Sequence, residues 1–159
     1  MQHCAYEEAS DKARQTECLY AELRFTYNLG MTDIAAYNKA LTGDTKKICE
    51  LLRKELIAGL KKSESKVWHG HPVWFLEGNP VAGYSVRKMG VTLLFWSGQS
   101  FKTPGLSAEG SFKAAQAVYA TPSEVKVTLV RKWLRESKSI QWNYKDIVKN
   151  KGKLSLLDV

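Results

Sequence analysis

The fold is decided by residues 67–97, VWHGHPVWFLEGNPVAGYSVRKMGVTLLFWS, where short aromatic and β-branched runs alternate with glycine and proline. Such runs are typical of strands. The pattern predicts four strands, over residues 66–69, 73–77, 81–88 and 91–97, and a later one over 112–119. The first four are joined by connections too short for the crossover that parallel neighbours require. We therefore expect an antiparallel meander with turns at residues 70–72, 78–80 and 89–90.

A helix is predicted on each side of this meander in the sequence. The first runs from Asp44 to Lys62, with Asp44 as its N-cap. Its apolar residues recur at three- and four-residue steps and form one stripe, made of Ile48, Leu51, Leu52, Leu56 and Leu60. The second begins at Thr121, which with Glu124 has the spacing of a capping box. Shorter helical elements are expected over residues 34–41 and 142–149.

This order of elements predicts an α+β fold. Two helices that bracket a meander pack most economically on one of its faces. The result is a two-layer sandwich, an antiparallel sheet of four to six strands with helices on one face. Trp68, which follows the first helix, is expected in the core between helix and sheet.

The second face of the sheet is the first candidate for function. Along residues 91–96 both alternating sets are apolar, with Val91, Leu93 and Phe95 on one side and Leu94 and Trp96 on the other. The second face is therefore either covered by residues 142–154 or exposed to a partner or a small ligand. Trp74 and Trp96 are the candidate contact residues.

Charge divides the chain near residue 30. Residues 1–30 carry three basic and five acidic residues, so 21 of the 24 basic and 11 of the 16 acidic residues lie in 31–159, which has a net charge of +10. We expect residues 1–30 to be an extension outside the fold, ahead of a single domain over 31–154, with a short helix over 13–25 as the alternative. A domain with this much net positive charge favours anionic partners such as nucleic acid or an acidic protein.

The cysteines indicate a reducing compartment. Cys4, Cys18 and Cys49 are odd in number and widely spaced, without the spacing of metal ligands. Cys49 falls on the first predicted helix and is expected to be a small buried residue. No N-terminal stretch has the pattern of a signal peptide, and the longest apolar run, residues 91–96, is far too short to span a bilayer. The sequence predicts a cytoplasmic protein that does not associate with a membrane.

Three stretches resemble the YdhG-like family of small bacterial domains, namely WHGHPVW at 68–74, GNPVAGY at 78–84 and QWNYKDIVKNKGKL at 141–154. The resemblance spans about residues 31–154. It implies a fold like that of frataxin, an antiparallel sheet with helices on one face, in agreement with the architecture derived above. It also implies a role in binding iron, since at least one member is regarded as an iron chaperone, and an iron-accepting protein as the partner.

The residues offer two kinds of ligand for such a metal. Hard cations prefer oxygen ligands, and the first predicted helix carries the carboxylates Asp44, Glu50 and Glu55. His69 and His71 would lie on the same side of a regular strand, where two imidazoles can share a metal ion. In the alternative interpretation, both histidines are turn residues with ordinary hydrogen bonds.

A last candidate is the run of lysines near the C-terminus. Lys145, Lys149, Lys151 and Lys153 form either an anion-binding site or a solvated basic face. The chain shows no nucleophile elbow and no cofactor fingerprint. The leading hypothesis is therefore a non-enzymatic cytoplasmic binding domain that handles iron. The alternatives are a basic module for an anionic partner and a domain with a ligand pocket on the aromatic sheet face.

Overall fold

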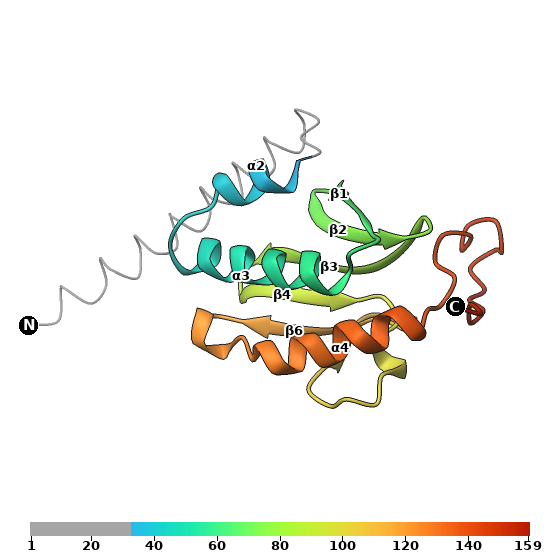
Figure 1. The fold of residues 1–159 in the computed structure, drawn as a ribbon. Helices are drawn as coiled ribbons and strands as arrows, with labels where there is room; N and C mark the ends of the chain where they lie inside the picture. The colour runs from blue at the N-terminus through green and yellow to red at the C-terminus, as the bar shows by residue number, and fades with distance from the viewer. Residues whose placement is uncertain (1–32) are drawn as a thin grey trace, which may run out of the picture.

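The computed structural model describes residues 33–159. Six antiparallel strands form one open sheet, and three helices pack against one of its faces (Figure 1). The predicted α+β architecture, an antiparallel sheet with its helices on one side, is confirmed. The extension predicted over residues 1–30, and the helix considered within it, lie outside the described residues.

The sheet has the order β1-β2-β3-β4-β6-β5. Its strands are β1 (Glu64–Trp68), β2 (His71–Leu76), β3 (Asn79–Arg87), β4 (Gly90–Phe95), β5 (Ser107–Ala108) and β6 (Ala115–Tyr119). The first four are the expected meander. The strand predicted over residues 112–119 is shorter in the structure, because pairing with β4 begins only at Ala115.

The first two turns of the meander lie earlier than predicted. His69 (φ 50°) and Gly70 (φ 80°) form the first, and Glu77 (φ 49°) and Gly78 (φ 76°) form the second. Positive φ at both central residues is the signature of a two-residue hairpin, whose twist matches that of the strands. The turn is therefore complete before the proline, and both Pro72 and Pro80 lie in strands.

The helices are α2 (Ile34–Lys39), α3 (Gly43–Gly59) and α4 (Val127–Ser139). Asp33 caps α2, since its Oδ1 accepts a hydrogen bond from the backbone N–H of Ala35 at 2.8 Å. Asp44 is not the cap of α3 but lies in its first turn, where its negative charge favours the helix N-terminus. The bounds of α3 otherwise agree with the prediction to within three residues.

The predicted start of the last helix is wrong in an informative way. The capping box of Thr121 and Glu124 does form, but it opens a separate 3-10 helix, η2 (Pro122–Glu124). Val125 then takes an extended backbone (φ −71°, ψ 100°) and is buried in the core. The chain therefore leaves the helical conformation to bury this side chain, and α4 begins at Val127.

The core lies between the sheet and the helices. Val91, Leu93 and Phe95 face it from β4, as the alternation predicts, and all three are buried. Trp74 of β2 is 1% exposed and contacts Tyr84 of β3, with ring centroids 5.7 Å apart. Trp74 is therefore a core residue, and its assignment to a contact surface is wrong because alternation along β2 turns it toward the helices.

Polar groups and one thiol complete the helix side. Tyr84 Oη donates a hydrogen bond of 2.7 Å to Asn38 Oδ1, which anchors α2 on the sheet. Cys49 is buried as predicted, and burial, with Glu50 nearby, raises the pKa of its thiol to about 12. This thiol is therefore protonated and inert at neutral pH.

Trp68 lies on the side of the sheet away from the helices. It pairs with His71 at the end of the edge strand β1, and 37% of its surface is exposed. The prediction of a core position is wrong, because alternation along β1 turns Val67 rather than Trp68 toward the core.

The chain after α4 forms turns rather than the predicted small helix. Asn79, at the start of β3, holds this C-terminal segment. Its Nδ2 donates to Gln141 Oε1 (3.2 Å) and to the carbonyl of Trp142 (3.1 Å). Its Oδ1 accepts from the backbone N–H groups of Tyr144 (2.9 Å) and Lys145 (3.1 Å). The segment consequently lies beside one end of the sheet (Figure 1). Within residues 33–159, no helix combines the length and apolar character needed to cross a membrane.

Replacing the two tryptophans tests their opposite placement. Trp74→Ala should lower the free energy of unfolding by about 3–5 kcal/mol, because it empties a fully buried site. Trp68→Ala is the matched control and should cost clearly less, since that ring already contacts water. Urea denaturation measures both, and equal losses would show that the faces are assigned wrongly.

Asn79→Ala should release the C-terminal segment. The change leaves the partly buried N–H groups of Tyr144 and Lys145 without their acceptor, at a cost of about 0.5–1.5 kcal/mol for each hydrogen bond lost. Hydrogen exchange at these two amides should accelerate. Asn79→Asp keeps an acceptor oxygen and should keep more of their protection. Unchanged exchange in Asn79→Ala would rule out the anchoring role.

Candidate functional site

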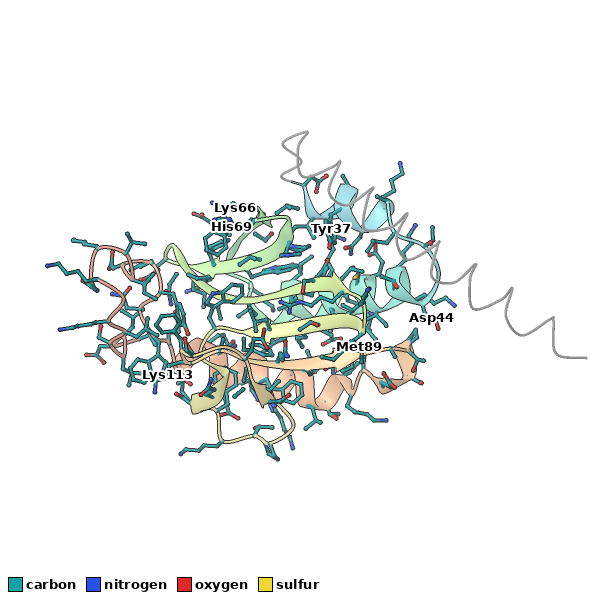
Figure 2. All side chains as sticks on the ribbon, turned by 180° about the vertical axis from the view of Figure 1, so that it is seen from behind. Tyr37, Asp44, Lys66, His69, Met89 and Lys113 are labelled. Carbon is teal, nitrogen blue, oxygen red and sulfur yellow. The ribbon has the colours of Figure 1, made fainter. Side chains whose placement is uncertain are left out.

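The sheet face opposite the helices carries the candidate site. Figure 2, which views the molecule from behind Figure 1, looks onto this face. None of the helices of residues 33–159 crosses it, and the C-terminal segment lies beside one end. The prediction that residues 142–154 cover this face is wrong, because Asn79 holds the segment at the end of the sheet. The other alternative, a second face that this segment leaves uncovered, describes the structure, although several side chains on the face are buried among their neighbours.

The strand register explains why this face is hollow. Residues paired across antiparallel strands point to the same side, and Gly83 of β3 pairs with Val73 of β2 and with Leu94 of β4. Ser85 follows Gly83 on the same side of β3. On this face β3 thus presents Gly83 and Ser85 between strands with larger side chains. The centre of the face is therefore recessed.

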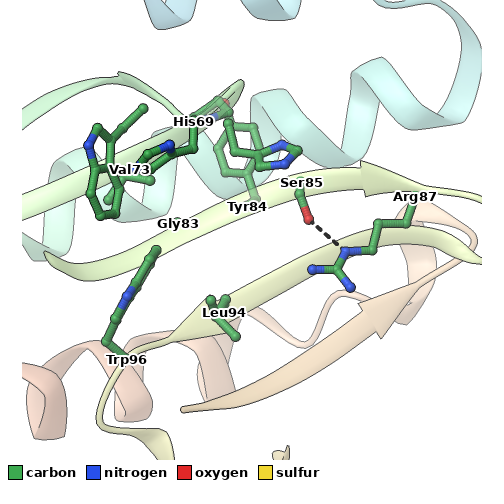
Figure 3. A pocket seen from close by; sticks show the side chains of 11 residues that line it. His69, Val73, Gly83, Tyr84, Ser85, Arg87, Leu94 and Trp96 are labelled. Atoms are coloured by element: carbon green, nitrogen blue, oxygen red, sulfur yellow. Dashed lines mark hydrogen bonds between the residues drawn. The ribbon is translucent and has the colours of Figure 1, made fainter. Parts of the chain in front are cut away.

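A pocket of about 170 Å³ occupies this low centre (Figure 3). Gly83, Val73 and Leu94 line its floor. An apolar cavity of about 150 Å³ accommodates a benzene molecule, so this pocket has room for an aromatic ring. A side chain at position 83 would be excluded by packing as well, because a Cβ atom there would lie 2.5 Å from the carbonyl oxygen of Pro72.

One end of the pocket is aromatic. Trp68 from β1 and Trp96 from the residue after β4 both line it, and their ring centroids lie 6.4 Å apart. Trp68 also contacts Phe75 edge to face at 5.5 Å and the ring of His69 at 4.3 Å. These contacts fix the orientation of the indole rings, which together form a wall against which a flat apolar group can pack.

The other end is polar and cationic. Arg87 Nε donates a hydrogen bond of 3.3 Å to Ser85 Oγ, and Figure 3 shows this pair at the opposite end of the pocket from Trp96. Arg87 Nη1 also lies 3.6 Å from Glu109 Oε1 in an exposed ion pair. Burial lowers the pKa of His71, and the positive charge of Arg87 and the neighbouring His69 lower it further. His71 is therefore neutral at pH 7.

The predicted metal ligands lie on two sides of the sheet. His69 and His71 both line the pocket, although His69 belongs to a turn and not to a regular strand. The carboxylates Asp44, Glu50 and Glu55 lie on α3, behind the sheet. Among residues 33–159, no group of three His, Cys, Asp or Glu side chains lies close enough to hold a metal ion.

The three carboxylates of α3 also have different surroundings. Asp44 pairs with Lys47 at 3.6 Å on the surface. Glu55 is buried and accepts two hydrogen bonds from Arg131 of α4, at 2.7 and 3.1 Å. Its oxygens are thereby committed to joining the two helices. Glu50 is exposed.

The remaining predicted residues are dispersed. Trp96 is the one candidate contact tryptophan that faces the pocket. Lys145 donates from Nζ to the carbonyl of Glu77 at 3.3 Å, and Lys149, Lys151 and Lys153 are exposed on the C-terminal turns. They line neither the pocket of the open sheet face nor the hollow at the ends of α3 and α4.

A second concentration of positive charge lies where α3 and α4 end. Lys61, Lys62 and Lys138 line a shallow hollow of about 470 Å³ between these helix ends. Lysines at a helix C-terminus offset the negative end of its dipole. This function explains their position, and we assign no ligand to the hollow.

Sequence reasoning missed the polar end of the pocket. The signal was the period-two alternation of β3, which turns Tyr84 and Val86 toward the core and Ser85 and Arg87 the other way. The predicted contact residues are both aromatic, Trp74 and Trp96. Applying the alternation to every residue of β3 places Arg87 on the same face as Trp96.

No protein-family model matches the chain, and neither a curated protein nor a solved structure shows a significant match to it. The resemblance to the YdhG-like family and to the frataxin fold therefore stays a prediction. The site has to be interpreted from its own geometry.

The pKa of His71 tests the electrostatics of the pocket. It should lie below the ordinary histidine value of 6.5. The stability that neutral His71 contributes is therefore fully present above that value and is lost as the pH falls through the lowered pKa. Arg87→Gln removes a positive charge and should raise the pKa, whereas Lys88→Gln, in the neighbouring turn, should leave it unchanged. NMR titration of the imidazole signals measures both, and an unchanged value in Arg87→Gln would contradict this account.

Proposed function

We propose that this chain is a non-enzymatic binding domain that holds a small molecule with a flat apolar body in the pocket of the open sheet face. The observation that carries the proposal is the pair of indole rings, Trp68 and Trp96, at one end of a hollow floored by Gly83. Ligand pockets are typically concave and apolar, with a few placed polar groups. This pocket has that composition.

The polar groups support binding rather than catalysis. Ser85 Oγ accepts its hydrogen bond from Arg87, and a guanidinium is a permanent donor that cannot take a proton from a hydroxyl group. The serine is therefore held by a cation, and among residues 33–159 it makes no hydrogen bond with a base. The pocket suits recognition of a ligand, with the aromatic end as the main contact area.

The two earlier functional hypotheses have less support from the described residues. Iron handling, with its iron-accepting partner, rests on the resemblance, and its candidate ligands lie on opposite sides of the sheet. A basic module for nucleic acid or an acidic protein rests on the net charge of +10 over residues 31–159. That charge is compatible with a small anionic ligand as well.

Titration with indole, a neutral flat probe, tests the proposal by NMR. Shifts should concentrate on the Nε1–H signals of Trp68 and Trp96 and on the amides of Gly83 and Leu94. Trp96→Ala should weaken binding by about 2 kcal/mol, or roughly thirty-fold, because a buried indole contact is lost.

The matched control is Val118→Ala, which trims an exposed apolar side chain of β6 on the same face but outside the pocket. It should bind indole as the natural chain does. Shifts spread evenly over the surface, or equal weakening by the two substitutions in folded protein, would refute the pocket as the binding site.

A further inference from the structure

The two ends of the pocket differ in chemistry. Figure 3 shows Trp96 at one end, Gly83 and Leu94 in the middle, and Ser85 with Arg87 at the other end. Ser85 pairs with Thr92 on β4, four residues from Trp96. At a rise of about 3.3 Å per residue, the backbone positions of the two ends are about 13 Å apart. A ligand that spans the pocket therefore needs an apolar body and a polar group at one end of it.

The positive charge at the polar end is only weakly compensated. The one carboxylate that pairs with Arg87 among residues 33–159 is Glu109, at 3.6 Å, and both side chains are exposed. Exposed pairs of this kind contribute between about 0 and 1 kcal/mol, so Glu109 can be displaced as a partner. Burial is the main cause of the lowered pKa of His71, and the nearby positive charge of Arg87 adds to it.

The donors at this end fit a compact group with a single negative charge. Arg87 uses Nε for Ser85, while its two terminal nitrogens present a fork that matches the two oxygens of a carboxylate. His71 and Ser85 add neutral donors. A phosphate would bring nearly two charges, and the pocket lining offers neither a lysine nor a helix N-terminus to balance the second one.

We infer that the ligand of this pocket is an aromatic carboxylate, with its ring against Trp68 and Trp96 and its carboxylate on Arg87. The inference rests on the proposed function, since it concerns the same pocket. It adds that Arg87 recognises the negative charge of the ligand.

Three probes of the same ring system separate this inference from the proposed function. Indole tests the apolar body, indole-3-acetate adds the carboxylate, and indole-3-acetamide replaces that carboxylate by a neutral group of similar shape. Calorimetric titration of the full chain should show the acetate binding at least about ten-fold more tightly than the acetamide, as expected for a charge-assisted hydrogen-bonded pair.

Substitutions then assign the preference to Arg87. Arg87→Gln should make the acetate and the acetamide bind equally. Lys88→Gln removes the same charge from the adjacent turn, outside the pocket lining, and should keep the preference. Glu109→Gln removes the competing carboxylate and should strengthen binding of the acetate alone.

The outcomes distinguish the two claims. Equal affinity for acetate and acetamide in the natural chain, with indole still bound and still sensitive to Trp96→Ala, overturns the inference and leaves the proposed function standing. Equal loss of the preference in Arg87→Gln and Lys88→Gln also overturns it, because overall charge would then explain the effect. Failure of all three probes to bind refutes both.

Discussion

The structure depends on the burial of one sheet face beneath α3 and α4. Arg131 of α4 donates two hydrogen bonds to the buried carboxylate of Glu55 on α3. The helices also approach closely at Gly59, where a Cβ atom would lie 2.8 Å from the side chain of Leu134. Because a buried carboxylate is costly unless it is paired, this contact fixes how the helices sit together. Their common surface then excludes water from the sheet beneath.

The pocket follows from this one-sided cover. β3 is buried along its whole length except at Arg87, although helices cover only one of its faces. On the other face, the burial comes from neighbouring strands, whose side chains rise above the small residues Gly83 and Ser85. The indoles of Trp68, on β1, and of Trp96, after β4, rise above these small residues, and the face is hollow between them. The same alternation therefore produces both the core and the site.

Much of this architecture is predictable from sequence, and the exceptions have physical causes. Element types, the antiparallel meander and the helix layer follow from periodicity and short connections. The predicted turns lie too late because the prediction treats proline as a turn residue, whereas paired positive φ angles at His69 and Gly70 complete the turn first. Trp68 and Trp74 were each assigned to the wrong face. The face of the sheet that each of these tryptophans takes depends on the register of its strand, and the register is set by pairing with other strands.

The pocket is encoded by one short part of the chain, residues 68–96, whereas the bond between α3 and α4 joins Glu55 to a residue 76 positions away. Contacts between near neighbours in sequence form quickly, and contacts across long loops form slowly. We therefore expect the meander to assemble ahead of the docking of α4. Substitutions in the floor of the pocket would then change the rate of folding, and substitutions at the joint between the helices would mainly change the rate of unfolding.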